Sequence, residues 1–380
     1  MGIEFIDLKA QRARLENEID AAIKAVLEHG KFIMGPEVKE FESELAAFGD
    51  AKHALGCGNG TDALLLALMA YRVGPGDAVF CPSFTFCATA EVVANVGATP
   101  VFVDIDRDTY NIDPDSLKQA ISEINAKGEL NPRAVIAVDL FGQAANYKDI
   151  ALIAKENGLK LIADSAQGFG STLDGKHPLS WADVTTTSFF PAKPLGCYGD
   201  GGAVLTDDDE TADVINSLRI HGKGVDKYDN VRVGANSRLD TLQAAILLPK
   251  LAVFAEEIEK RNIAAQRYTD ALEGYALRTP ALLSGVVSTW AQYTIEVADP
   301  MGFAAALKEK GIPTARYYPK PVHHQTAYRH YPVQGNGLGN TEDCVDKIIS
   351  LPMHPYLDEE IQDVIIETAK ACLAREASEG

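Results

Sequence analysis

Near the start of the chain, apolar residues recur with the period of an α-helix. Gly30 and the pair Gly35-Pro36 interrupt this period. The pattern therefore predicts one amphipathic helix before the break and a second over Glu37–Phe48 after it. The residues that share one face of the first helix are Leu15, Ile19, Ala22, Ile23, Val26 and Leu27.

From Lys52 onward, short apolar runs alternate with stretches of helical period. Tyr147–Asn157, for example, carries its apolar residues on one face and lies between two such runs. This order predicts βαβ units, and hence a mostly parallel sheet with helices on both faces. Such sheets bind ligands at the carboxyl ends of their strands. The runs that we expect to form strands are Val79–Cys81, Pro100–Asp104, Ala134–Leu140, Leu159–Asp164, Val184–Phe189 and Gly202–Thr206.

The remainder of the chain indicates a second, smaller unit. A polar loop over His221–Arg238 leads into a long helix near Thr241–Phe254, with a bend expected at Pro249. We predict a large α/β domain with an N-terminal helical arm over residues 1–250 and a small α+β domain over 251–380. The elements expected in the small domain are a strand over Trp290–Val297 and helices over Met301–Lys310 and Ile361–Leu373.

Composition and charge narrow the range of partners. The chain has 380 residues, of which 46% are hydrophobic, and its net charge is −19. A strongly acidic surface repels nucleic acid and anionic membranes, so we expect neither as a partner. A local cluster of basic residues could still bind an anionic small molecule.

The six cysteines follow no CxxC or zinc spacing. We therefore expect reduced thiols and no metal site. The sequence also shows neither a signal-peptide pattern nor an apolar run of membrane-spanning length, which predicts a cytoplasmic protein.

A glycine-rich turn precedes one predicted helix, in the segment Gly58–Leu64. Its glycines allow a ligand to approach the backbone closely, and Thr61 is a suitable N-cap for a helix over Ala63–Ala70. Free N–H groups at a helix N-terminus form an anion site. The alternative is a capped helix without a ligand.

Two predicted strands end in residues suited to catalysis. One run ends in Asp164, and the next leads through Ser188, a candidate phosphate ligand, to Lys193. A buried carboxylate needs a cationic partner, and the pyridinium nitrogen of pyridoxal 5′-phosphate (PLP) is one. The apolar neighbours of Lys193 favour its neutral, nucleophilic amine. Singly, Asp164 could cap a helix and Lys193 could lie in a surface loop, but together they favour a PLP site.

These segments resemble the DegT/DnrJ/EryC1/StrS family of sugar aminotransferases, which have the fold-type I PLP fold. The resemblance extends from Phe32 to Glu360. It implies a seven-stranded type of sheet and a smaller C-terminal α+β domain. The motifs that carry it are FIMGPEVKEFE, GNGTDAL, PSFTFCATAE, DSAQGFG, SFFPAKPLGCYGDGG, GANSRLDTLQAAIL and SLPMHPYLDEE.

The resemblance implies roles for residues around the cofactor ring. Lys193 matches the catalytic lysine that binds PLP as a Schiff base, and Asp164 matches the carboxylate on the ring nitrogen. Gln167 matches the residue near the ring hydroxyl. Phe86 matches the aromatic residue that stacks on the ring, although a core phenylalanine is the alternative there.

The resemblance also implies a phosphate site formed by Gly60, Thr61 and Ser188. Asn236 matches an asparagine that reaches the phosphate from the neighbouring subunit. This assignment implies a homodimer with shared active sites.

The family resemblance further implies a reaction. One branch replaces the lysine by histidine and catalyses dehydration, so Lys193 implies amino transfer, with pyridoxamine 5′-phosphate as the amino-carrying form. The motifs look most like the branch that transfers the amino group of L-glutamate to C3 of a UDP-linked 3-oxo-2-acetamido sugar uronate, for bacterial surface polysaccharide such as O-antigen. The alternatives are a 4-keto nucleotide sugar as substrate and a non-catalytic regulatory protein of this fold.

Four residues are candidates for binding the substrate. Because both substrates carry carboxylates, we expect an arginine in the cleft, and Arg238 follows Asn236 into the shared site. Pairing of Arg238 with Asp240 or another surface carboxylate is the alternative. The other candidates, in a segment that departs from the HYPxPLH pattern of relatives, are Tyr317, Tyr318 and His323, of which His323 could instead be a structural residue.

Overall fold

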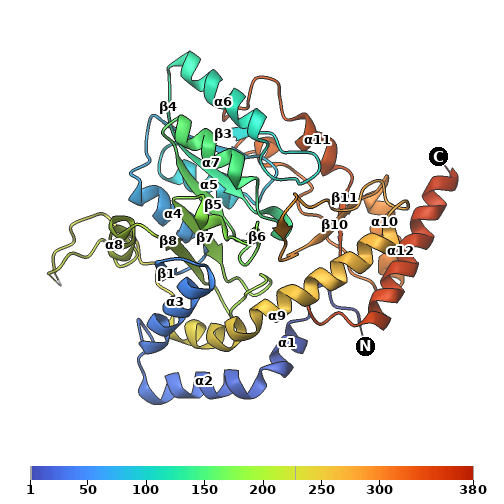
Figure 1. Ribbon diagram of the computed structural model, residues 1–380, viewed down its shortest axis with the longest axis horizontal. Helices are drawn as coiled ribbons and strands as arrows, with labels where there is room; N and C mark the ends of the chain where they lie inside the picture. Colours follow the sequence, from blue (N-terminus) through green and yellow to red (C-terminus); the bar gives the residue numbers. More distant parts are fainter. Residues whose placement is uncertain (1, 227, 380) are drawn as a thin grey trace.

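A seven-stranded sheet forms the centre of the protein (Figure 1). The computed structural model describes residues 2–226 and 228–379. The strand order is β1-β8-β7-β5-β4-β2-β3, and β8 alone in this sheet runs antiparallel to its neighbours. The mostly parallel sheet predicted from the sequence is therefore present. Its strands are β1 (His53–Cys57), β2 (Asp77–Pro82), β3 (Thr99–Val103), β4 (Asn131–Val138), β5 (Lys160–Asp164), β7 (Val184–Ser188) and β8 (Gly202–Thr206).

Successive side chains of each strand point to opposite faces of the sheet, and different helices cover each face. Val204 of β8 packs in one apolar cluster and its neighbours Ala203 and Leu205 pack in another. The face that includes Val204 is covered by α4 (Gly60–Ala70), α5 (Ala88–Asn95) and α8 (Asp209–Leu218). The opposite face is covered by α3 (Pro36–Phe48), α6 (Pro114–Lys127), α7 (Tyr147–Glu156) and part of α9 (Thr241–Leu272).

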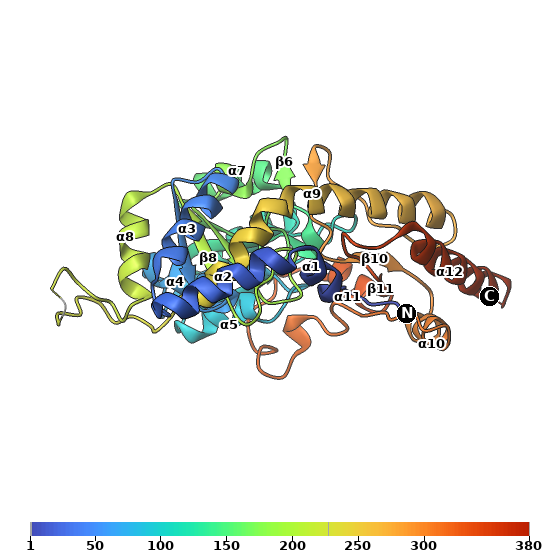
Figure 2. The same ribbon diagram turned by 90° about the horizontal axis from the view of Figure 1, so that it is seen from below.

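The N-terminal helices lie along the long helix α9, as Figure 2 shows. Of the predicted apolar face, Ile19 and Val26 are buried, but Leu27 is 59% exposed, so its place on that face was wrong. Helix α9 continues through Pro249 and across the predicted domain boundary. The helices of this arm are α1 (Leu8–Arg14) and α2 (Glu16–His29).

The C-terminal part forms its own apolar cluster around a two-stranded sheet. None of the described helices is long and apolar enough to cross a lipid bilayer. The division into two domains remains a prediction. The remaining elements are β6 (Thr172–Leu173), β9 (Val286–Val287), β10 (Tyr293–Glu296), β11 (Ile348–Leu351), α10 (Pro300–Glu309), α11 (Gly339–Val345), α12 (Glu359–Glu379), and the 3₁₀ turns η1 (Leu140–Gly142), η2 (Pro178–Ser180) and η3 (Val322–His324).

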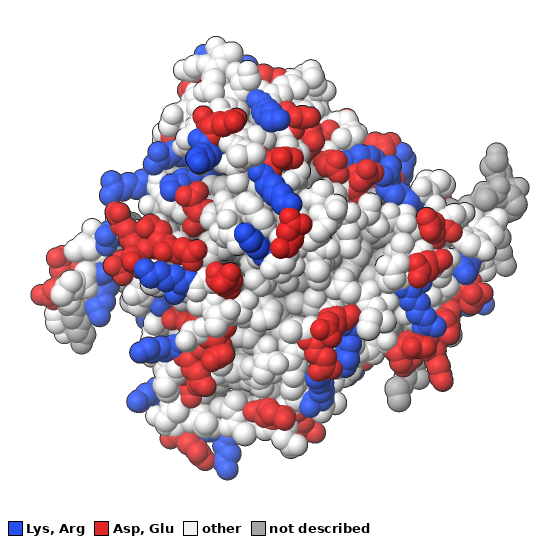
Figure 3. Space-filling view, in the orientation of Figure 1, with Lys and Arg blue, Asp and Glu red and all other residues white. Residues whose placement is uncertain are grey.

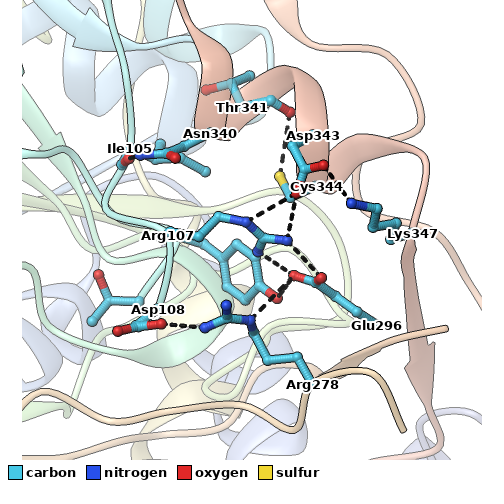
Figure 4. A network of polar contacts seen from close by, with 12 residues as sticks. Ile105, Arg107, Asp108, Arg278, Glu296, Asn340, Thr341, Asp343, Cys344 and Lys347 are labelled. Atoms are coloured by element: carbon cyan, nitrogen blue, oxygen red, sulfur yellow. Dashed lines mark hydrogen bonds and ion pairs between the residues drawn. The ribbon is translucent and has the colours of Figure 1, made fainter.

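A network of ion pairs joins the loop after β3 to β10 and α11 (Figure 4). The guanidinium of Arg107 pairs with Glu296 and donates to Asp343 over 2.8 Å. The hydroxyl of Tyr110 donates to Glu296 over 2.6 Å, and Arg278 pairs with Asp108. Burial alone would raise the pKa of Glu296, but the bonds from Arg107 and Tyr110 outweigh it and lower that pKa. The network therefore fastens the C-terminal elements to the large sheet.

Acidic and basic side chains intermix over the face drawn in Figure 3. A group of acidic side chains stands out near α8. Despite the net charge of −19, the charge on this face is mixed, so local sites for anions or for cations are compatible with it.

Candidate active site

One cavity of about 610 Å³ opens at the carboxyl ends of β5 and β7, beside the N-terminus of α4. This is the sheet edge where the sequence places Asp164 and Lys193. Most predicted cofactor residues line it. The lining residues with predicted roles are Gly60, Thr61, Phe86, Asp164, Gln167, Ser188, Lys193, Tyr317 and Tyr318.

The turn before α4 is built for an anion. Asn59 is the N-cap, because its side chain accepts from the N–H of Asp62 over 2.8 Å; the prediction that Thr61 caps the helix was wrong. Within the described chain, the N–H groups of Gly60 and Thr61 donate to no protein acceptor. They remain available to a phosphate.

Gly60 also lets the turn approach β7. A Cβ atom at this position would lie 2.6 Å from the Cβ of Ser188, closer than real Cβ contacts. The absence of a side chain therefore brings the hydroxyl of Ser188 to the free N–H groups of the helix. Side chain and backbone donors together form one phosphate cradle.

Asp164 ends β5 as a buried carboxylate. Thr89 donates to its Oδ2 over 3.0 Å, and the N–H of Ala166 donates to Oδ1 over 3.3 Å. Since the hydroxyl hydrogen of Thr89 points to Asp164, the contact of 3.0 Å between Thr85 and Thr89 must have Thr85 as donor. Burial raises the pKa of Asp164, while these bonds and the charge of Lys193 partly oppose the rise. Within the described part of the chain, neutral donors alone hold this carboxylate in place.

Lys193 lies in the loop after β7, with its side chain half-buried in the cavity wall. Burial lowers the pKa of its ammonium group, although the charge of Asp164 acts in the opposite direction. The loop is fixed from behind by Lys250 of α9, whose ammonium donates to the carbonyl of Gly196 over 2.6 Å. The loop therefore presents an amine with increased neutral, nucleophilic character at a defined place.

Gln167 is oriented by two hydrogen bonds. Its side-chain oxygen accepts from the N–H of Phe141 over 2.8 Å, and its amide nitrogen donates to the hydroxyl of Tyr318 over 2.9 Å. The ring of Phe86 lies at the cavity, 54% exposed, with its centroid 6.1 Å from that of Tyr318. The predicted stacking role of Phe86 stays a prediction.

Three predicted residues lie outside the cavity lining. Asn236 is exposed, and its side chain accepts from Arg238 over 2.7 Å. Within the described chain, Arg238 forms no ion pair with Asp240. His323 contacts Ser83 and Glu342 instead of the cavity. Their predicted substrate and cofactor contacts therefore stay predictions.

The described residues of the loop over 221–238 project from the molecule beside α8 (Figure 1). Lys227, within the predicted loop, lies outside the described residues. The hydroxyl of Ser237 accepts from the N–H of Gly58 over 3.0 Å and donates to Asp62 over 2.7 Å. The base of the loop is thereby attached to the phosphate cradle, a link that the sequence analysis missed.

A family model for the DegT/DnrJ/EryC1/StrS aminotransferase family matches residues 13–370. The chain belongs to this family. It is a PLP-dependent aminotransferase, which confirms the fold class, the enzyme class and the cofactor predicted from the sequence.

Two relatives illustrate the range of the family. The chain is 48% identical, over 94% of its length and 96% of the relative, to UDP-2-acetamido-2-deoxy-3-oxo-D-glucuronate aminotransferase of Pseudomonas aeruginosa. It is 42% identical, over 97% of both chains, to a protein of Geobacillus stearothermophilus named as a pleiotropic regulatory protein.

Solved structures have the same architecture. A DegT DnrJ EryC1 StrS aminotransferase of Brucella abortus superposes with a TM-score of 0.96 at 52% identity, covering 97% of this chain and 99% of that one. NtdA of Bacillus subtilis, solved with bound pyridoxamine phosphate, superposes with a TM-score of 0.85 at 31% identity, covering 94% and 82%.

The donor set of the cavity fits PLP. The cradle at Gly60 suits a phosphate, Lys193 supplies an amine, and buried Asp164 suits a cationic ring nitrogen. Both Thr85 and Thr89 stand in the motif PSFTFCATAE, but the sequence analysis missed that they support Asp164.

The N-terminal segment of the aminotransferase also reaches the site. Ile6 lines the cavity, and the rings of Phe5 and Tyr317 lie 6.3 Å apart between centroids. No sequence motif indicated this contact, because it joins residues that are far apart in the chain.

Proposed function

We propose that the protein transfers an amino group from L-glutamate to C3 of a UDP-linked 3-oxo-2-acetamido sugar uronate. The observation that carries the proposal is that Lys193 and Asp164 meet in one cavity with a phosphate cradle. PLP, when bound, supplies an electron-withdrawing ring that accommodates the charge left when a C–H bond of the substrate breaks. The 48% identity to the Pseudomonas aeruginosa enzyme supports the choice of sugar.

Different residues of the cavity move the proton, hold the ring nitrogen and bind the phosphate. The amine of Lys193 moves the proton as general base and then as general acid. The carboxylate of Asp164 keeps a proton on the ring nitrogen, and Thr89 keeps that carboxylate oriented. The N–H groups of Gly60 and Thr61, with the hydroxyl of Ser188, bind the phosphate.

A coupled assay with 3-oxo and 4-oxo UDP-sugars tests the position of transfer. We expect glutamate-dependent turnover of the 3-oxo uronate and at least about 10²-fold lower kcat/KM for the 4-oxo sugar, because a displaced carbonyl loses its near-attack geometry. Turnover of the 4-oxo sugar alone would make the alternative substrate class correct.

The charge of the cavity supports a shared site in a homodimer. Among its described lining residues, Lys193 is the single cation, whereas Asp62, Asp164 and Asp200 are acidic. The substrates and the cofactor add further negative charges. We therefore propose that Arg238 and Asn236, which do not line the cavity of their own chain, complete the cavity of a second subunit.

Exposed apolar residues of the loop that precedes Arg238, and Ile33 before α3, support this association. Val225 and Val233 of the projecting loop and Ile33 before α3 expose between half and all of their surface. Such residues are typical of a surface covered by a partner.

Mixing two inactive variants tests the shared site. Lys193→Ala and Arg238→Ala chains, unfolded together and refolded, should regain about one quarter of wild-type activity, since half the dimers are mixed and each has one intact site. If both residues act within one chain, no activity returns.

The name of the Geobacillus stearothermophilus relative supports a second candidate, a regulatory role without turnover. A protein that binds PLP but releases no 2-oxoglutarate from glutamate with any keto sugar would support it. We place the aminotransferase reaction in the cytoplasm, since the chain shows no disulfide framework in its cysteine spacing, and assign the product to surface polysaccharide such as O-antigen.

A further inference from the structure

A cluster of two histidines and one carboxylate lies apart from the catalytic cavity. His323 and His324 belong to η3, and Glu342 belongs to α11. The Nε2 atom of His323 lies 3.4 Å from Oε1 of Glu342, and the Nε2 atom of His324 lies 3.7 Å from the same oxygen. One donor atom from each residue fits within a span of 4.8 Å.

These separations match the edges of a tetrahedral metal site. With metal–ligand distances of about 2.0–2.1 Å, adjacent ligands of tetrahedral zinc lie about 3.3–3.4 Å apart. The distance from His323 to Glu342 already has this length, and the distance from His324 to Glu342 is slightly longer. Because His324 is 51% exposed, its ring can turn and bring its donor atom closer to the other two ligands.

His323 is positioned by a second hydrogen bond. Its side chain is 9% exposed, and its Nδ1 atom lies 2.6 Å from the hydroxyl of Ser83. Bonding of one ring nitrogen to a neighbouring oxygen fixes the ring and leaves Nε2 free for a metal, as in most histidine ligands.

Glu342 stands on a helix that is fixed at its base. Asp104 accepts from the N–H groups of Asn340 and Thr341, each over 2.9 Å. The next residue, Asp343, accepts from Arg107 (Figure 4). The helix therefore cannot easily carry Glu342 away from the two histidines.

We propose that His323, His324 and Glu342 bind a zinc-class divalent cation. Two imidazoles and one carboxylate are a known ligand set for zinc, with the fourth position left to water. The site joins η3 to α11 and, through Ser83, to the end of β2. The ion stabilises this junction and takes no part in amino transfer, because none of the three ligands lines the catalytic cavity. No sequence motif indicated this cluster, because Glu342 follows His323 by 19 positions.

Zinc titration of the PLP-loaded enzyme tests the site. We expect one equivalent of Zn²⁺ to bind and to raise the melting temperature of the wild type. Removal of one ligand, by His324→Ala or Glu342→Gln, should weaken binding at least about tenfold and abolish the thermal shift. The matched control is His330→Ala, which removes an exposed histidine outside the cluster and should leave binding unchanged.

The outcomes separate the proposal from adventitious binding. Equal zinc affinity in the wild type and in both ligand variants, or no zinc binding in the wild type, overturns the site. Neither result bears on amino transfer, because binding and thermal stability are the readouts.

Discussion

Two carboxylates of this aminotransferase, Asp164 and Glu296, are equally inaccessible to solvent and differ in almost everything else. Asp164 is 5% exposed and Glu296 is 2% exposed. Glu296 is bonded by Arg107 and Tyr110, with Arg278 nearby, and its pKa is lowered. Asp164 is bonded by a threonine and a backbone N–H, and its pKa is raised.

The difference distinguishes a structural carboxylate from a functional one. Glu296 is satisfied by its own chain and joins two parts of the fold. Asp164 is oriented by neutral donors, and among the described residues no arginine or lysine forms an ion pair with it. A buried acid with a raised pKa beside a nucleophilic lysine is the pattern of a catalytic site.

The largest effect should follow from Asp164→Asn. We expect turnover to fall by about 10²–10³-fold, because the amide cannot stabilise a protonated ring nitrogen. The free energy of unfolding of the cofactor-free protein should not fall, since burial disfavours the charge that is removed. Steady-state kinetics and urea unfolding measure the two quantities. Unchanged turnover would contradict the functional role of Asp164.

Glu296→Gln should have the opposite profile. Two arginines then lose their buried counter-charge, and the free energy of unfolding should fall by about 3 kcal/mol. Turnover per folded molecule should stay within about twofold of wild type, since Glu296 lies outside the cavity. The control Glu309→Gln, at an exposed position of α10, should change stability by less than about 0.5 kcal/mol. Slower turnover of Glu296→Gln without a loss of stability would contradict the structural role of Glu296.

The pH dependence of stability should have opposite signs at the two sites. The pKa of Glu296 is lowered, so its contribution is present above the ordinary value of 4.5 and is lost as pH falls through the folded-state pKa. The pKa of Asp164 is raised, so the cofactor-free protein loses stability as pH rises from 3.8 toward the folded-state pKa.

Urea unfolding of cofactor-free wild type and both variants against pH resolves these contributions. In a plot of the free energy of unfolding against pH, Glu296→Gln should remove the loss of stability on the acid side. Asp164→Asn should remove the loss of stability that the wild type shows as pH rises above 3.8. Identical profiles for all three proteins would contradict the assigned pKa directions.

The smallest effects should come from a matched pair of tyrosines. Tyr318→Phe removes the acceptor of the Gln167 amide, which should lower kcat/KM about fivefold, equivalent to about 1 kcal/mol. Tyr110→Phe removes a donor to Glu296 and should lower stability by about 1.5 kcal/mol without a kinetic change. If both variants alter the same quantity, the two sites are not separate in function.

Much of the fold could be predicted from the sequence, because buried strands leave continuous apolar runs. The exception is β1, in which the short run Ala54–Cys57 includes Gly56 and gives a weak signal. The run beginning at Ala134 ends earlier than expected, since β4 stops at Val138 and Leu140 opens the 3₁₀ turn η1.

The sequence indicated those parts of the candidate site that lie at the end of a predicted strand or shortly after it, namely Asp164 and Lys193. Contacts between distant segments were not predictable. Thr89 reaches Asp164 across 75 positions, and Ser83 reaches His323 across 240. Local sequence patterns cannot indicate such pairs, so the contact between Ser83 and His323 was not expected, and the substrate role of His323 stays a prediction.

The most direct test of Lys193 as the covalent anchor of the cofactor is borohydride reduction of the PLP-loaded enzyme, followed by peptide mass mapping. We expect close to one reduced adduct per chain, on the peptide that contains Lys193. An adduct confined to another lysine, or no adduct at Lys193 in active enzyme, would contradict the assignment.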